Sequence, residues 1–291
     1  NGAIHYSIVA IVYGISMAVY YSSFHIYFTK FSDKKHEASE VSIIRALFRF
    51  AAIIGPLIGA VLITKESFRL SFLIVSGLLV ISIFPLFITK DKKIKKPKIT
   101  INRILKSDTR KKGLSYVASG ILGVTAGVLW PLFIYLNIKT VISLGLIISI
   151  GSLITIFFLF LVGKMADKHK TRVLKTGVYT HSITWPIRLF FLTPIGIFVM
   201  NLLSAITLLM IDLPFSKLIY EKGRKSKSIA NYFLFREMNL QIGRLMVLLI
   251  AFFTGSIYWT FILSFFATFI YLVLLKDKDE IPILSLLPDD D

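Results

Sequence analysis

The residues whose types and spacing most clearly point to chemistry are Glu237, Gln241 and Arg244. They stand at intervals of four and three residues, so they share one face of an α-helix. That helix, Ala230–Thr254, is apolar and long enough to cross a bilayer, where an ionised side chain costs roughly 2.5 kcal/mol or more. Because a guanidinium cannot lose its proton, Arg244 must face either a buried acceptor or an anionic or carbonyl-rich group of a bound molecule.

The preceding apolar segment, Pro194–Ser216, carries a second and weaker polar stripe that includes Asn201 and Asp212. A buried carboxylate can pair with a guanidinium or carry a proton, so Asp212 and Glu237 are candidates for both roles. Two interpretations of Arg244 therefore stay open. Pairing with one of these carboxylates would make its role structural, whereas facing a cavity alone would make it a binding group.

An interrupted helix is expected around Trp130-Pro131, because a proline removes a helical hydrogen bond and three glycines precede it. Membranes tolerate such a break where protein or a water-filled cavity satisfies the freed carbonyl, so Trp130 is a candidate to line a cavity. The alternative is plain helix packing by the glycines, with Trp130 at a membrane interface. His25 and the tyrosines near it could line the same cavity or form a membrane belt.

Helices must position these side chains, because 55% of the 291 residues are hydrophobic and only 17% are charged, too few for the surface of a large soluble fold. The chain has no cysteine, which excludes disulfides and thiolate metal sites. We expect an all-α, polytopic membrane protein with nine transmembrane helices. The nine apolar segments are Tyr6–Phe28, Val41–Thr64, Phe68–Ile88, Leu114–Asn137, Val141–Val162, Val173–Leu192, Pro194–Ser216, Ala230–Thr254 and Ile257–Leu275.

The distribution of basic residues predicts the topology. Most of the 34 Lys and Arg residues lie in or beside loops that follow odd-numbered segments, whereas Lys65, Arg69 and Lys139 lie on the other side. The positive-inside rule then places the loop 90–113 and the C-terminus in the cytoplasm, in a multi-pass protein of the cell membrane. Arg236 is expected to extend to the cytoplasmic water. Since no aromatic residues interleave the basic loop, nucleic acid is not an expected partner.

The same loop divides the segments unequally, with three before it and six after it. Comparison of the chain with itself places Gly55 on Gly243, which suggests a weak internal repeat of the kind found in transporters. If the two halves are equivalent, three further helices precede this sequence and the nine become twelve. The expected units are 1–89 (three helices of an N-terminal half), 90–113 (a basic linker), 114–276 (a six-helix C-terminal half) and 277–291 (a cytoplasmic tail).

The stretch from Gly163 to Arg172 resembles the cytoplasmic signature of the major facilitator superfamily. Its glycine, alanine, aspartate and first and last basic residues fit the pattern, at Gly163, Ala166, Asp167, Lys168 and Arg172. Lys170 and Thr171 depart from the usual glycine and basic residue. A second and weaker resemblance is to a helix-packing motif of exporters in the same family, on Gly55, Pro56 and Gly59.

The resemblance implies a six-plus-six helical fold that acts as a monomer and carries a small solute by alternating access. It also implies that Asp167 acts as a latch, bonded near the start of the second helix at Ser39–Arg45. Glu237 or Asp212 would carry a coupling proton, and the exporter-like motif favours outward transport. The expected partners are the lipid bilayer, a small solute and protons, with no cofactor and no metal.

A different class of function, a multispan enzyme acting on a lipid-linked substrate, is the main alternative. Such an enzyme needs catalytic groups clustered at one membrane face. The five histidines are scattered along the chain, and no paired carboxylates or metal-ligand spacings stand at a segment end. A non-enzymatic function is therefore favoured. A receptor or assembly factor that transports nothing is a third possibility, which no residue excludes.

Overall fold

The computed structural model describes residues 2–31, 37–88, 100–105 and 110–275, and these ranges are helical apart from short connections. The predicted all-α, polytopic fold is confirmed. The helices are α1 (Gly2–Phe31), α2 (Glu37–Lys65), α3 (Phe68–Ile81), α4 (Phe84–Ile88), α5 (Ile101–Leu105), α6 (Arg110–Val124), η1 (Thr125–Leu129), α7 (Trp130–Ile138), α8 (Val141–Ile187), α9 (Pro194–Lys225), α10 (Ile229–Thr254), α11 (Tyr258–Ile270) and η2 (Tyr271–Leu275). The predicted tail, 277–291, lies outside the described residues, as does most of the linker.

Five of the described helical stretches are long and apolar enough to cross a membrane. They are Ala46–Lys65, Lys112–Ile138, Val141–Ile187, Pro194–Lys225 and Ile229–Thr254, and two shorter apolar stretches are Phe68–Ile81 and Tyr258–Val273. α8 alone has 47 residues, about twice the length that a bilayer requires. Its backbone leaves the helical range at His169, so α8 contains two of the predicted crossings joined at a kink.

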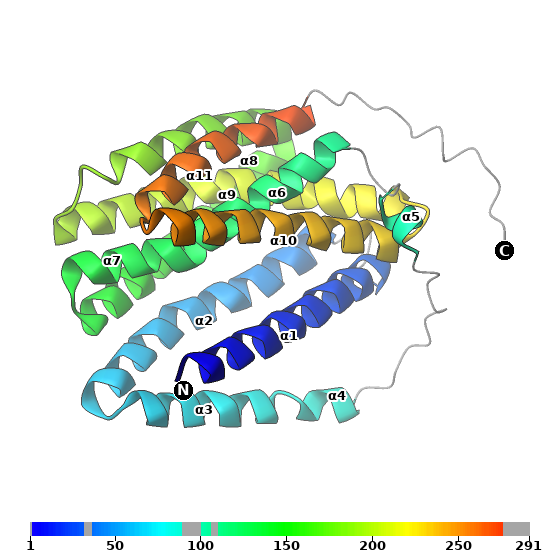
Figure 1. Ribbon diagram of the computed structural model, residues 1–291. Helices are drawn as coiled ribbons and strands as arrows, with labels where there is room; N and C mark the ends of the chain where they lie inside the picture. The colour runs from blue at the N-terminus through cyan, green and yellow to red at the C-terminus, as the bar shows by residue number, and fades with distance from the viewer. Residues whose placement is uncertain (1, 32–36, 89–99, 106–109, 276–291) are drawn as a thin grey trace.

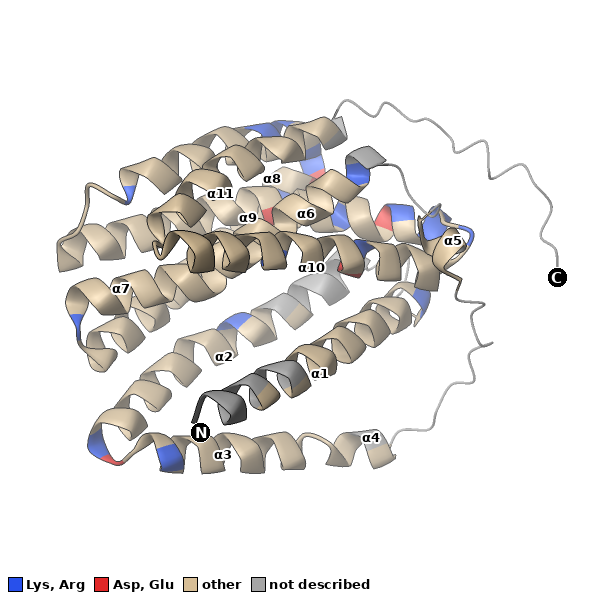
Figure 2. Ribbon diagram, viewed as in Figure 1, with Lys and Arg blue, Asp and Glu red and all other residues tan. Residues whose placement is uncertain are grey.

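The helices lie side by side in a bundle, with α1, α2 and α3 along one flank of the group formed by α6 to α11 (Figure 1). Lys and Arg gather at the end of the bundle that carries α5, and few lie at the opposite end (Figure 2). The main buried core runs through α6 to η2 and includes Trp185, Phe233 and Phe261. α3 has no buried residue, and within the described ranges its main packing is along α2.

The expected interruption at Trp130-Pro131 is a bulge rather than a break. Residues Thr125–Leu129 form a single turn of π-helix, in which the Trp130 N–H donates to the Thr125 carbonyl, and α7 follows without a gap. Pro131 has no N–H to donate to the preceding turn, and the widened turn absorbs this defect. The Thr125 side chain is buried and accepts a hydrogen bond from Ser264 on α11 at 2.9 Å.

α6 and α10 meet backbone to backbone at two glycines. A Cβ atom on Gly243 would lie 2.0 Å from the Val117 carbonyl oxygen, and one on Gly120 would lie 2.1 Å from the Leu240 carbonyl oxygen. Only a residue without a side chain permits this approach, which is how helices pack tightly in membranes. The contact fixes the position of α10, and therefore of Glu237 and Arg244, against α6.

α2 and α8 also meet at a small residue, although not at the glycines of the predicted motif. A Cβ atom on Gly145 of α8 would lie 2.7 Å from the Ala60 Cβ and 2.9 Å from the Pro56 carbonyl oxygen. Gly55 and Gly59 have no such neighbour within 4 Å. Of the three motif residues, it is therefore Pro56 whose backbone lies in this helix contact.

Replacement of Gly243 by alanine tests the close approach of α6 and α10. We expect Gly243→Ala to lower the free energy of unfolding by roughly 1–3 kcal/mol or more, because the clashing atom belongs to the backbone and cannot rotate away. The matched control is Gly77→Ala on α3, where nothing lies within 4 Å of the added atom and alanine favours the helix. Thermal unfolding in detergent measures both, and equal melting temperatures for the two variants would contradict the packing described.

Candidate functional site

A cavity of about 410 Å³ lies between α1 and α2 on one side and α6, α9 and α10 on the other. Its size falls within the range of small-molecule sites. The wall from α1 and α2 is mainly aromatic, with Tyr21, Phe24 and Phe48, and includes His25. The opposite wall carries the carboxylates and guanidinium groups of the cavity, which belong to Asp212, Arg236, Glu237 and Arg244.

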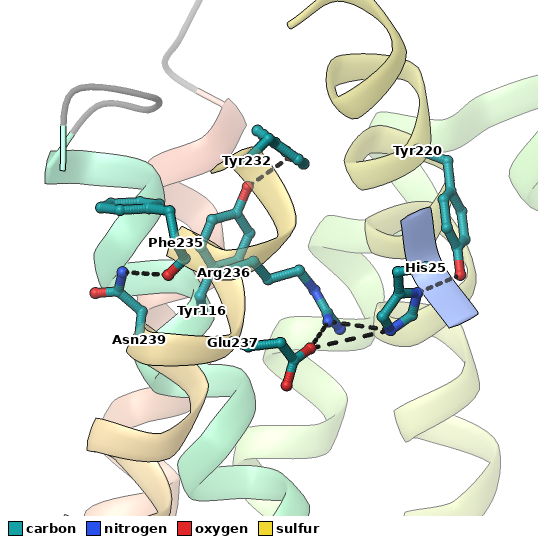
Figure 3. Close-up of polar contacts among 8 residues, drawn as sticks. All are labelled: His25, Tyr116, Tyr220, Tyr232, Phe235, Arg236, Glu237 and Asn239. Carbon is teal, nitrogen blue, oxygen red and sulfur yellow. Dashed lines mark hydrogen bonds and ion pairs between the residues drawn. The ribbon is translucent and has the colours of Figure 1, made fainter. Parts of the chain in front are cut away.

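His25 on α1 is joined to α10 by a charged contact that crosses the cavity (Figure 3). Arg236 Nη1 donates to Glu237 Oε1 and lies 3.2 Å from His25 Nε2. The same carboxylate oxygen lies 4.0 Å from His25 Nε2. The Glu237 residue is only 7% exposed, so its carboxylate depends on these partners to offset the loss of water.

The other nitrogen of His25 contacts α9. His25 Nδ1 lies 3.0 Å from the Tyr220 hydroxyl oxygen. A guanidinium can only donate, so Nε2 must accept from Arg236, and the ring is then neutral with its proton on Nδ1. That proton is donated to Tyr220. In this state His25 connects α1 to two helices of the opposite wall.

Aromatic rings enclose this polar contact. Phe233 of α10 stacks on His25 with ring centroids 5.2 Å apart and planes 8° from parallel. Phe28 lies 5.1 Å from the Tyr220 ring, and Tyr220 lies 6.0 Å from Phe233. Farther along α10, the Tyr232 hydroxyl lies 2.7 Å from the Tyr116 hydroxyl of α6 (Figure 3). Excluding water in this way strengthens the electrostatic interactions inside the ring cluster.

The three residues of the predicted stripe occupy different surroundings. Glu237 and Arg244 both line the cavity, while Gln241 is exposed on α10 outside the lining. Asp212 lines the cavity from α9. No hydrogen-bond or ion-pair partner of the Arg244 guanidinium lies among the described residues. Of the two interpretations of Arg244, this favours the one in which it faces a cavity alone.

The expectation that Arg236 extends to the cytoplasmic water is wrong. Its side chain is 15% exposed and is directed at Glu237 and His25. Helical periodicity indicates that residues 236 and 237 lie on adjacent faces, but it cannot reveal that α1 supplies a histidine between them. The sequence pattern predicts His25 as a cavity residue only together with its tyrosine neighbours, and it does not predict Arg236 in the site.

Trp130 and Asn201 lie together but away from this cavity. The Trp130 indole Nε1 donates to Asn201 Oδ1 at 3.0 Å, which joins α7 to α9. Beside them lies Arg188, which is fully buried and stands between two indole rings, 4.5 Å from Trp130 and 3.9 Å from Trp185. Arg188 donates to Ser204, and its Nε and Nη1 have no hydrogen-bond partner among the residues that the structure describes. Arg188 stands near the end of its apolar segment, a position from which its burial could not be predicted.

The signature motif lies at the kink of α8 and is paired with α9. Asp167 accepts from Lys217 Nζ at 2.8 Å, and Lys170 Nζ donates to Glu221 at 3.1 Å. Lys168 and Arg172 are exposed, and Gly163 has open space where a Cβ would stand. The partner predicted for Asp167 cannot be compared, because the side chains at 39–43 and 45 lie outside the described residues.

Within the described part of the chain, no group of three or more His, Asp or Glu residues is arranged to hold a metal ion. The chemistry that the cavity can perform is therefore binding and proton exchange by Asp212, Glu237 and His25, together with anion binding by Arg244. These roles need no cofactor.

One comparison with known proteins identifies a family. The family model described as Major Facilitator Superfamily matches residues 5–216, which run from near the start of α1 into α9. No curated protein sequence matches the chain significantly.

Arg188 generates a prediction about stability. Replacing a buried charge by an apolar side chain of similar volume is often neutral or stabilising, and two nitrogens of Arg188 lack partners. We therefore expect Arg188→Met to keep or raise the melting temperature in detergent. Arg188→Lys should lower it, because an ammonium cannot stack flat between two indole rings. Arg69→Met, at an exposed position, is the control, and a large loss of stability in Arg188→Met would contradict this account.

Proposed function

This chain belongs to the major facilitator superfamily of membrane transporters, and we propose that the cavity between α1, α9 and α10 is where it binds the solute it carries. It is a multi-pass secondary transporter, embedded in a lipid bilayer, and not an enzyme. Membership of the family sets aside the alternative of an enzyme acting on lipid-linked substrates. The cavity supports the proposal because it contains ionisable groups with no catalytic cluster.

The observation that carries this proposal is the contact of His25 with Arg236, Glu237 and Tyr220. It connects α1, from the segment before the basic linker, with α9 and α10 from the segment after it. Alternating access requires the two parts of a transporter to rock about a central site. A polar contact across the cavity must then break and form again in each cycle.

We further propose that protons control this contact. Protonation of Glu237 would remove the charge that neutralises Arg236, and protonation of His25 would replace the acceptor at Nε2 by a donor. Protonation of His25 turns its contact with Arg236 from attraction to repulsion, and protonation of Glu237 removes the charged partner that holds the Arg236 guanidinium in place. Asp212, in the same cavity, is the second carboxylate that could carry a coupling proton.

The remaining parts of the proposal concern orientation and the surface motif. The bias of basic residues supports a cytoplasmic location for 90–113 and the C-terminus, in the cell membrane. Asp167, Lys168 and Arg172 would act as a latch at that face, and the resemblance at Gly55-Pro56 favours export. We propose that the protein works as a monomer, since its cavity lies within one chain.

Proton control can be tested without knowing the solute, because the chain has no cysteine of its own. A single thiol introduced in the cavity as Ser216→Cys reports access by its rate of modification with a membrane-impermeant maleimide. Because maleimide reacts with the thiolate, this rate is expressed at each pH relative to that of an exposed reference thiol, Glu66→Cys. We expect this relative rate to differ severalfold between acidic and alkaline buffer in liposomes. Adding Glu237→Gln, which mimics the protonated acid, should hold the rate near its acidic value in both buffers. Glu66→Gln is the exposed control. An unaltered pH dependence in the Glu237→Gln protein would refute the proposal.

The latch can be tested with the same reporter. The pair of Asp167 and Lys217 is about half exposed, so Asp167→Asn should change the free energy of unfolding by less than about 1 kcal/mol. If the pair steadies one conformation, the modification rate of Ser216→Cys should nevertheless change severalfold. Glu221→Gln, which breaks the neighbouring pair with Lys170, shows whether the effect is specific to the motif. Identical rates with and without Asp167→Asn would remove the latch from the proposal.

A further inference from the structure

We propose that the carried solute is an amphipathic organic anion, whose acidic head binds to Arg244 and whose apolar body lies against α1 and α2. This inference rests on the proposed function, because it assigns a class of substrate to the same cavity. It follows from the charges of the lining, the depth of Arg244 and the unequal chemistry of the two walls.

The charges of the cavity leave one cationic group available. Arg236 and Glu237 bind to each other, and the carboxylate of Glu237 is buried. Asp212 has interactions of its own. Arg244 lines the cavity, and its guanidinium has no partner among the described residues. A solute carrying one negative charge would give the Arg244 guanidinium a partner.

The depth of Arg244 makes such a partner necessary. It stands fifteen residues after the first residue of α10, which is about 22 Å along the helix and near the centre of a bilayer. At this depth a guanidinium stays charged and cannot be left facing lipid at low cost. A carboxylate can accept two parallel hydrogen bonds from it, which is the strongest pairing that its geometry allows.

The two walls of the cavity predict the rest of the molecule. α1 and α2 contribute Tyr21, Phe24 and Phe48, whose rings can pack against an apolar body. The opposite wall contributes hydroxyl groups, from Ser119 and Ser216, beside the charged residues. A volume of about 410 Å³ suits a molecule of modest size. An inorganic anion would leave the aromatic wall without a partner.

A cationic solute fits this arrangement less well. It would need a carboxylate, but Glu237 is already bound to Arg236 and close to His25, and Asp212 has interactions of its own. It would also bring a second positive charge near Arg244, and the low dielectric of the membrane makes that repulsion strong. A neutral solute would leave the guanidinium without a counter-charge. The anion is the choice that satisfies the groups already present.

The test uses three probes with the same phenyl body and different charge: 3-phenylpropionate, 3-phenylpropionamide and 3-phenylpropylammonium. Binding to the purified full chain in detergent is measured by equilibrium dialysis and by protection of Ser216→Cys from maleimide. We expect the carboxylate to bind best. Arg244→Gln should weaken its binding tenfold or more, the scale of a lost charge-assisted hydrogen bond, and should leave the amide unchanged. The affinity of Arg244→Lys for the carboxylate should lie between those of the unmodified chain and of Arg244→Gln. Arg69→Gln is the control.

The outcomes separate this inference from the function on which it rests. Four outcomes would each overturn the anion site. They are preference for the ammonium, equal binding of all three probes, absence of carboxylate binding, and carboxylate binding that is insensitive to Arg244→Gln. Persistence of pH-dependent access to Ser216→Cys would leave the proposed transporter intact in those cases. Conversely, Arg244-dependent binding of the carboxylate without any flux in liposomes would uphold the site and refute the proposed transport. A melting temperature for Arg244→Gln close to that of the unmodified chain excludes misfolding as the cause.

Discussion

A guanidinium that enters a membrane keeps its charge, and the arrangement of this bundle depends on how three of them are accommodated. Arg188 is held between the faces of two tryptophans. Arg236 is held by a carboxylate and an imidazole. Arg244 faces a cavity. The first solution uses the electron density of aromatic rings and one serine hydroxyl group, the second uses groups that can take up protons, and the third leaves room for a bound molecule. Three chemically equal side chains thus have different roles: Arg188 in packing, Arg236 in regulation and Arg244 in recognition.

The backbone contact of α6 with α10 makes this division possible. Because Gly120 and Gly243 bring the two helices together without intervening side chains, α10 cannot rotate to move Arg244 out of the cavity. Glu237, two turns earlier, is held in register by the same contact. The polar wall of the cavity is therefore a fixed surface. α1 meets that wall through side chains alone, in the contact of His25 with Tyr220, Phe233 and Arg236.

The fold was largely predictable from the sequence, because long apolar runs in a chain with few charges have few solutions other than membrane helices. The candidate site was predictable in part. Periodicity placed Glu237 and Arg244 on one face, and both line the cavity. Periodicity could not identify His25 as the neighbour of Arg236, because the two residues are more than 200 positions apart in the sequence. The π-helical turn before Trp130 could not be predicted either. A proline indicates that a helical hydrogen bond is lost, but it does not indicate how the backbone adjusts to the loss.

Two of the contacts that join the part of the chain before the basic linker to the part after it differ in kind. At Gly145, α2 and α8 meet through Pro56 and Ala60, so no charge is involved and protons cannot alter the contact. At His25, the partners are an arginine, a carboxylate and a phenol, all of which respond to the protonation of a neighbour. If the two parts rock against each other, the apolar contact can serve as the pivot, because small residues slide without breaking hydrogen bonds. The polar contact is then the one that a proton can open, and it lies beside the cavity whose access it would control.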